Sequence, residues 1–392
     1  MPGGRRSVLR AGRVFDGDAV HAKGWVLIQD SVVVAVEQGG VEPPAEVSIT
    51  DFGADSFLMP GMIDAHSHLC IVPGEDAVQA VVEADDGTLL ERARTAAAQA
   101  LAAGITTIRD LGDRSYTTVQ LRDELAGNPL PGPHLVVSGP PITTAGGHCH
   151  FLGGEAQGRQ ALRAAVRERA DHGCDVLKVM ASGGGITKGS SPYLSQYTRD
   201  ELTMLVDYAR SFGMSTAAHA HGTAAIIDAT AAGFDTLEHA SFATPDGIVR
   251  DDHLIDDLAR SQIVISATMG FDPASHLALA RNSCRTTLEI RQRLHELGAP
   301  IVVGTDAGIH PSKPHDVLPH GVADLPSIGF TPIEALRSAT GLAAHACGVG
   351  QRKGRLIAGY DADILVLADD PTVDLSALHT VRAVYRLGTR VR

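Results

Sequence analysis

Two histidines one residue apart end a short apolar run at residues 60–69, PGMIDAHSHL, which follows a Pro-Gly turn. Because alternate residues of a β-strand face the same side, His66 and His68 can converge on one point. Neutral imidazole is a ligand for zinc and other first-row metal ions. A His-x-His pair alone also fits a polar strand end, so the rest of the chain has to decide between the two interpretations.

The elements that would position these histidines recur along the chain from residue 58 onward. Eight short apolar runs predict strands, at residues 61–69, 104–111, 133–139, 174–183, 214–222, 234–241, 262–268 and 300–308. Longer amphipathic segments between them predict helices, most of which end at a glycine just before the next strand. Eight alternating strand–helix units indicate an α/β fold of the (β/α)8 TIM barrel type.

The two ends of the chain differ from this middle part. They are rich in β-branched residues punctuated by glycine, which is typical of short strands. We expect residues 1–57 and 346–392 to form one composite β-sandwich domain beside a barrel domain of residues 58–345. The last barrel helix is marked by FTPIEALRSATG, where Thr331 can cap the helix, Pro332 comes first and Glu334 completes a capping box.

Composition narrows the class of protein. The formal net charge of −13, with no basic run beyond Arg5-Arg6, argues against nucleic acid or an anionic membrane as partner. The five cysteines are far apart and form no CxxC pair, which favours reduced, buried thiols over disulfides or a thiolate zinc site. Since no segment has the apolar length of a membrane span or signal peptide, we expect a cytoplasmic protein.

Polar residues gather where the predicted strands end, and in such barrels these ends share one mouth. Each of them alone could be structural: His239 could be a core histidine and Asp306 could cap a helix. Together they favour a metal site with room for two ions. The set comprises His66, His68, Lys178, His219, His221, His239 and Asp306.

Lys178 is the unusual member, because an ammonium group has no lone pair with which to bind a metal ion. A neutral lysine amine can add carbon dioxide, and the resulting carbamate could bridge two ions. The alternative is an ordinary ion pair between Lys178 and Asp306 or Glu238.

These residues and the wording around them, PGMIDAHSHL, LKVMASGGG, AAHAHG, LEHAS, GTDAG and YDADILVLADDP, resemble the amidohydrolase superfamily. Within it the chain is similar to the imidazolonepropionase-related branch, and there to metal-dependent carboxypeptidases, prolidase-like enzymes and ochratoxinase-type amidases. The resemblance implies a distorted barrel with two divalent ions, zinc being the expected metal. The implied ligands are His66, His68, carboxylated Lys178, His219, His239 and Asp306.

The resemblance also implies a chemistry, amide hydrolysis by a hydroxide that bridges the two ions, with Asp306 carrying the proton. Imidazolonepropionases resemble single-metal enzymes without the lysine, so Lys178 favours hydrolysis of a peptide or N-acyl amino acid bond. His148, in the segment ITTAGGHCHFLGG, is expected to polarise the carbonyl or hold a substrate carboxylate, and the alternative is a loop histidine in solvent. His221 is expected to contact the substrate. Gly184 is expected to belong to a mobile wall over the ions, formed by the glycine run at residues 183–185.

Other functions stay open at this point. The same ions could serve a deaminase or a cyclic amide or imidazolone hydrolase, and a barrel could keep its metals as a non-catalytic scaffold. Asp306 argues against the scaffold, which needs no proton carrier. The expected partner is a small amide, and the resemblance implies a homo-oligomer.

Overall fold

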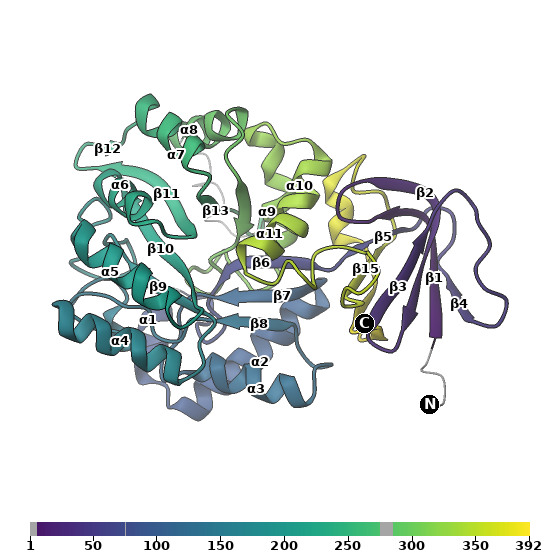
Figure 1. Cartoon of the computed structure of the whole chain (residues 1–392), viewed down its shortest axis with the longest axis horizontal. Coiled ribbons are helices and arrows are strands. Elements are labelled where there is room, and N and C mark those ends of the chain that lie inside the picture. The colour runs from purple at the N-terminus through teal and green to yellow at the C-terminus, as the bar shows by residue number, and fades with distance from the viewer. Residues whose placement is uncertain (1–5, 75, 275–284) are drawn as a thin grey trace.

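All eight predicted strands are present in the computed structural model, which describes residues 6–74, 76–274 and 285–392 (Figure 1). Their apolar residues are buried from end to end in β6, β7 and β9, as is typical of parallel strands covered on both faces. The strands are β6 (Met62–Ser67), β7 (Ile105–Asp110), β8 (His134–Val137), β9 (Val176–Met180), β10 (Ser215–Gly222), β11 (Thr236–Thr244), β13 (Val264–Thr268) and β14 (Ile301–Gly304).

The structure divides these strands between two parallel sheets. One has the order β6-β7-β8 and the other β14-β13-β11-β10-β9, with the short β12 (Gly247–Ile248) antiparallel to β11. Isolated parallel bridges, Ser67 to Ala307 and Ile142 to Val179, connect their edges. The sheets therefore adjoin at both edges without forming one continuous ladder, and the carboxyl ends of all eight strands lie toward the same side of the molecule.

Helices surround the two sheets (Figure 1). The capping box predicted for Thr331 and Glu334 is present, with Pro332 as the first helical residue. The helices are α1 (Ala77–Glu83), α2 (Asp86–Ala102), α3 (Thr117–Gly127), α4 (Arg159–Asp171), α5 (Arg199–Arg210), α6 (Thr223–Ala232), α7 (Asp252–Ser261), α8 (Arg285–Glu296), α9 (Leu318–Asp324), α10 (Pro332–Ser338) and α11 (Gly341–Ala346). Short 3₁₀ helices are η1 (His150–Leu152), η3 (Leu325–Ile328) and η4 (Leu375–His379).

Segments from both ends of the chain form one eight-stranded sheet of order β17-β16-β15-β5-β1-β2-β3, with β4 beside β1. The join is the antiparallel pairing of β5 with β15. β5 spans the boundary predicted after residue 57, and the domain limits stay a prediction. The strands are β1 (Arg6–Phe15), β2 (Val20–Gln29), β3 (Val32–Glu37), β4 (Ser48–Asp51), β5 (Phe57–Pro60), β15 (Ile364–Leu367), β16 (Val381–Arg386) and β17 (Thr389–Arg390).

The eight-stranded sheet packs closely against the two parallel sheets and their helices at Gly104, which follows α2. Its φ of +90° lies in the left-handed region, and an added Cβ would come within 2.7 Å of Leu365 on β15. A glycine is therefore required there for two reasons, the backbone conformation and the approach of the C-terminal strand.

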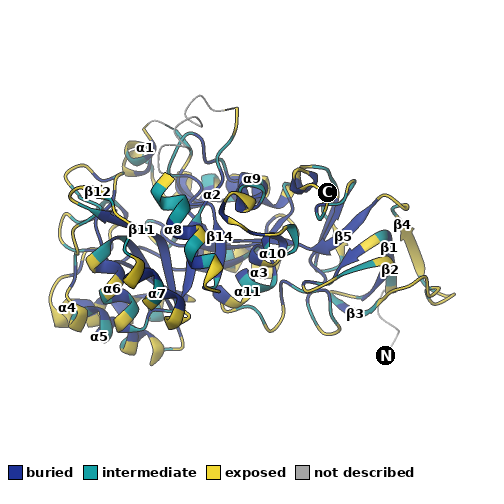
Figure 2. Cartoon of the chain, turned by 90° about the horizontal axis from the view of Figure 1, so that it is seen from above, coloured by how far each residue is buried: buried dark blue, intermediate teal, exposed yellow. Residues whose placement is uncertain are grey.

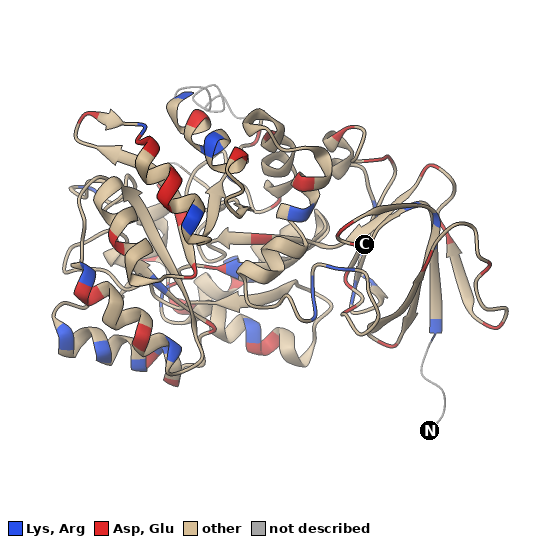
Figure 3. Ribbon diagram, turned by 45° about the horizontal axis from the view of Figure 1, so that its top comes forward, with Lys and Arg blue, Asp and Glu red and all other residues tan. Residues whose placement is uncertain are grey.

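Burial follows the layers, with dark, buried strands inside and exposed residues on the outer helix faces (Figure 2). Basic and acidic residues are interspersed along the outer helices (Figure 3), which fits the absence of a basic stretch in the sequence. No helix among the described residues is both long and apolar enough to span a membrane. Four cysteines, Cys70, Cys149, Cys174 and Cys347, are free and buried, and Cys284 lies outside the described residues.

Candidate metal centre

His66, His68 and Asp306 converge at the carboxyl ends of β6 and β14. The Nε2 atoms of the two histidines lie 3.3 Å apart, and Oδ1 of Asp306 is 3.3 Å from one and 3.2 Å from the other. All three residues are buried. The facing predicted from strand alternation thus brings the two imidazoles to one point, with the predicted carboxylate beside them.

The other ring nitrogen of each histidine is held by a fixed acceptor. Nδ1 of His66 donates to Glu238 over 2.8 Å, and Nδ1 of His68 donates to the carbonyl of Gly112 over 3.0 Å. A ring that donates through Nδ1 and is neutral carries its lone pair on Nε2. Both lone pairs therefore point at the place where the two Nε2 atoms meet Asp306.

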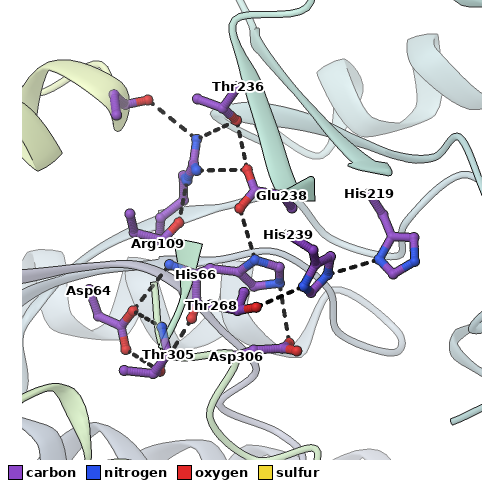
Figure 4. A network of polar contacts seen from close by, with 12 residues as sticks. Asp64, His66, Arg109, His219, Thr236, Glu238, His239, Thr268, Thr305 and Asp306 are labelled. Carbon is purple, nitrogen blue, oxygen red and sulfur yellow. Dashed lines mark hydrogen bonds and ion pairs between the residues drawn. The ribbon is translucent and has the colours of Figure 1, made fainter. Parts of the chain in front are cut away.

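Glu238 is itself locked in place by residues from three strands (Figure 4). Its Oε1 accepts hydrogen bonds from Thr236 at 2.7 Å and from Arg109 at 3.0 Å. Arg109 also donates to the carbonyl of Ala65, next to His66, at 2.7 Å. Although burial opposes ionisation, the Arg109 guanidinium holds the pKa of Glu238 far below its usual range. The carboxylate therefore stays ionised and fixes the His66 ring.

The backbone of Asp306 has an uncommon conformation, with φ at +58° in the left-handed region. Neighbouring hydrogen bonds stabilise it: the Asp306 amide donates to the carbonyl of His66 at 2.7 Å, and Thr305 donates through its amide and hydroxyl to the buried carboxylate of Asp64. Strain of this kind needs support from its surroundings and is found at functional sites. The Asp64–Thr305 contact thus ties β14 to β6 directly beneath the predicted proton carrier.

His219, His221 and His239 form a second group at the ends of β10 and β11. Nε2 of His219 donates to the carbonyl of Gly183 at 3.1 Å, which leaves its Nδ1 bare, 3.0 Å from Nε2 of His239. Nδ1 of His239 lies 3.0 Å from the Thr268 hydroxyl, and Nδ1 of His221 lies 2.9 Å from that of Ser241. His221 therefore stands with the predicted ligands His219 and His239 rather than apart from them.

The donor chemistry of the two groups fits metal ions. Within each group, one ligand atom from every residue lies within 4.8 Å of the others, and such groups are found twice among the described residues. Burial lowers the pKa of His66 to about 4 and that of His221 to about 4, and it holds the pKa values of His219 and His239 well below their usual range. In the neutral tautomers that leave the facing nitrogens unprotonated, a cation between the rings would replace the hydrogen bonds seen between them.

Lys178 on β9 lies in the same chamber, buried beside both groups. Its charge affects the pKa values of His66 in the first group and His239 in the second. Burial lowers the pKa of its own amine. Glu238 hydrogen-bonds His66, Arg109 and Thr236, and the charges of Glu238 and Asp306 both oppose the lowering of the Lys178 pKa, so both carboxylates lie within electrostatic reach of Lys178.

His148 and Gly184 are neighbours at the edge of the chamber. The ring of His148 lies 4.5 Å from that of His219, centroid to centroid, and its buried Nδ1 has no hydrogen-bond partner within the described chain. Burial lowers the pKa of His148 to about 3. An added Cβ on Gly184 would come within 2.4 Å of this ring. His148 thus lies in the chamber, not in solvent, and Gly184 is the residue that leaves room for it.

Several supporting residues were not predicted as part of the site. Arg109, Asp64 and Thr268 have no role in the predicted site, and Glu238 is predicted there only as a possible ion-pair partner of Lys178. The available signal was a charged residue inside an otherwise apolar strand segment, as in GITTIRDL and GMIDAHSHL. Such a charge has to be paired when the strand is buried.

Known proteins are similar to this chain over almost its whole length. The ochratoxinase of Aspergillus niger is 25% identical over 417 residues, covering 96% of this chain and 84% of that protein. The imidazolonepropionase of Stenotrophomonas maltophilia (strain R551-3) is 23% identical, covering 95% and 90%. A crystal structure of a Xaa-Pro dipeptidase with bound methionine superposes with a TM-score of 0.85 at 24% identity, covering 98% of this chain and 99% of that one.

The family model named amidohydrolase family matches residues 57–391, which include every residue of both histidine groups, Lys178 and Asp306. Members of this family are generally metal-dependent, in keeping with the two groups of ligand atoms. The match begins at β5 and runs to residue 391, so it also includes the C-terminal strands β15, β16 and β17. The chain belongs to the amidohydrolase family, as a hydrolase that acts on carbon–nitrogen bonds.

Proposed function

We propose that the protein is a binuclear metal-dependent amidohydrolase that cleaves a peptide or N-acyl amino acid bond in a small molecule. The observation that carries the proposal is the pair of adjacent ligand groups, His66, His68 and Asp306 in one and His219, His221 and His239 in the other. Lys178 lies within electrostatic reach of both. Two divalent ions, with zinc the expected metal, would supply Lewis acidity and lower the pKa of a water molecule between them.

Lys178 is proposed to be carboxylated when the ions are present. Burial favours the neutral amine, which is the form that adds carbon dioxide, and the carbamate would add a second negative charge, beside Asp306, to a chamber in which six imidazoles line the wall. A carboxylate at this place is a suitable ligand for both ions, whereas an ammonium group would repel them.

Asp306 is proposed to carry the proton. Although burial opposes ionisation, the neighbouring His66 and His68 hold its pKa well below the usual range, so its carboxylate is ready to accept a proton from the attacking water. It can then return that proton to the leaving nitrogen as the carbon–nitrogen bond breaks. The left-handed backbone at Asp306 helps to set the position of this carboxylate beside His66 and His68.

His148 and His221 are proposed to orient the substrate. The unpartnered Nδ1 of His148 can donate to the carbonyl oxygen or to a substrate carboxylate once the ring is in the matching tautomer. His221 borders the same chamber and, given its place in the second group, could bind an ion instead. Metal analysis of a His221→Ala variant separates these roles, since only a ligand role predicts loss of an ion.

A second candidate is deamination or opening of a cyclic amide by the same residues. The similarity to an imidazolonepropionase over 95% of this chain favours keeping it in view. The two reactions differ in product, because a deaminase releases ammonia and an amide hydrolase of the proposed type releases an amino acid.

The proposed function is tested with metal-loaded protein and a panel of N-acyl amino acids, dipeptides, cyclic amides and aminopyrimidines. We expect release of free amino acids from the first two classes, loss of turnover with a chelator, and recovery with zinc. Ammonia as the only product, or turnover that survives complete removal of metal, would contradict the proposal.

A further inference from the structure

The chamber that holds the candidate metal ligands is small. It encloses about 60 Å³, roughly the share of two water molecules in the liquid. Ions, a water molecule and the amide group itself fill such a space. The remainder of any amide substrate must therefore lie outside it.

A second, larger cavity adjoins the chamber. It has a volume of about 690 Å³, within the range of pockets that hold small organic ligands. Ile186 and Ile309 line both cavities. We call the larger one the outer groove, and its lining is Gly74, Asp76, Ala77, Val78, Gln79, Val82, His150, Phe151, Ile186, Thr187, Lys188, Ile309, His310 and Pro311.

The outer groove is built from segments that follow β6, β8, β9 and β14, and three of these strands, β6, β9 and β14, also carry or lead to candidate metal ligands. Ile186, Ile309 and Phe151 pack on a buried apolar cluster that includes Met180 and Leu152 of the chamber wall. Ile186 and Ile309, which line both cavities, therefore join the apolar part of the chamber wall to the groove.

Helix α1 gives the groove an apolar face of its own. Val78 and Val82 stand four residues apart and so share one side of the helix. An adjacent side of the helix is packed into the protein through Ala77 and Val81, which are buried. Val82 keeps 49% of its surface exposed, and both Val78 and Val82 line the outer groove.

The ionisable groups of the described groove lining offer no net negative charge to a cationic ligand, because the charges of Lys188 and Asp76 balance. Lys188 is exposed and brings a positive charge, and His150 and His310 offer imidazoles, whereas Asp76 is the one carboxylate in the described lining. A free dipeptide would bring its ammonium group into this apolar, Lys188-bearing space. A blocked amide would bring only an uncharged acyl chain or ring.

We propose that the outer groove is the binding subsite for the acyl group of the substrate, and that it selects an apolar, uncharged acyl group over acetyl and over a free aminoacyl group. The proposal rests on amide hydrolysis in the adjoining chamber. Ile186 and Ile309 hold the acyl chain where it leaves the chamber, and Val78, Val82 and Phe151 cover its distal part.

The first test is a series of N-acyl amino acids that share one leaving amino acid and differ in acyl length, from acetyl to octanoyl, together with the matching free dipeptide. Burial of each methylene group predicts a rise in kcat/KM of about fourfold until the groove is filled. In a Val78→Gln/Val82→Gln variant the octanoyl-to-acetyl ratio should fall at least tenfold. Val249→Gln, a similarly exposed valine outside the groove at 45%, should keep the wild-type ratio.

The second test measures binding without turnover, using butyrate and octanoate in calorimetry with the zinc-loaded protein. Octanoate should bind at least tenfold more tightly than butyrate to wild type and to Val249→Gln, and the difference should vanish in Val78→Gln/Val82→Gln. Hydrolysis that is independent of chain length, or preference for the free dipeptide, would overturn the groove but leave amide hydrolysis intact. If no amide is cleaved, the proposed function fails, and equal binding of the two acids would then also reject the groove.

Discussion

A histidine binds a metal ion through a given ring nitrogen only in the tautomer that leaves this nitrogen unprotonated, and at His66 and His68 the acceptors behind the rings choose that tautomer. Glu238 and the carbonyl of Gly112 accept the Nδ1 protons of His66 and His68. The cost of burying Glu238 is offset by Arg109 and Thr236. The ligand geometry is therefore prepared by hydrogen bonds before any ion arrives.

Asp306→Asn tests the role of the proton carrier. Asparagine keeps the shape and one ligand oxygen, and it tolerates the left-handed backbone at this position better than most residues. Turnover should fall by about 10²- to 10⁴-fold, as is usual on loss of a general acid or base, while most of the bound metal stays. Steady-state kinetics and metal analysis on the same preparation measure both, and activity within a few-fold of wild type would reject the assignment.

How far single residues could be predicted depends on what fixes them. His66, His68 and Asp306 follow from strand alternation and from the common mouth of a barrel, so their meeting could be predicted. The partnership of His66 with Glu238 joins residues 172 positions apart and depends on strand order, which no local pattern carries. The positive φ of His239 and Asp306 likewise depends on tertiary packing.

The loop after β9 forms the wall between the ligands and the solvent, and its glycines differ in what they contact. Gly183 offers its carbonyl to His219, and Gly184 leaves space for the ring of His148. Gly185 lines the chamber, but an added Cβ there meets nothing within 4 Å. Two adjacent glycines thus provide a variant and its own control.

Gly184→Ala should push the His148 ring out of its place, because the new methyl group would come within 2.4 Å of it. If His148 orients the substrate, kcat/KM should fall by tenfold or more, with metal content unchanged. Gly185→Ala should behave like wild type in both measurements. Equal activity of the two variants would show that the place of His148 does not matter to turnover.

Elements with strong local signals could be predicted well. The eight strands, the glycine-terminated helices and the capping box at Thr331 appear where the sequence places them. The division of the strands between two sheets and the isolated bridges between those sheets could not be predicted, because they depend on the twist and stagger of neighbouring strands.

A buried network of ion pairs connects the C-terminal part of the chain to the turn between β5 and β6. Asp363, at the start of β15, accepts hydrogen bonds from Lys353 at 2.8 Å and from Arg386 at 2.7 Å. Its backbone carbonyl accepts from the amide of Gly61, which lies between β5 and β6. The network therefore fixes the C-terminal strands to the turn that leads directly into the first strand of the site.

Asp363→Asn should destabilise the protein by about 3–5 kcal/mol, because it leaves the buried Arg386 without its carboxylate and leaves Lys353 with Asp361 as its one carboxylate partner. Although burial opposes it, Lys353 lowers the pKa of Asp363, so the stabilisation is complete above the unfolded-state value of about 3.9 and is lost as pH falls through the lower folded-state pKa. Urea unfolding from pH 7 to pH 3 should show the difference from wild type shrinking only at the acidic end. The exposed Asp369→Asn should stay within about 0.5 kcal/mol of wild type at every pH, and an equal loss of stability in both variants would contradict the role of the network.

The central claim is that two ions lie between the histidine groups with Lys178 shared between them. A crystal structure of the protein loaded with zinc in the presence of bicarbonate tests it most directly. We predict two ions about 3.5–4 Å apart, imidazole nitrogens at about 2.0–2.1 Å from them, and continuous density for a carbamate on the Lys178 nitrogen. A single ion bound by His66 and His68, with a bare ammonium at Lys178, would contradict the two-metal account.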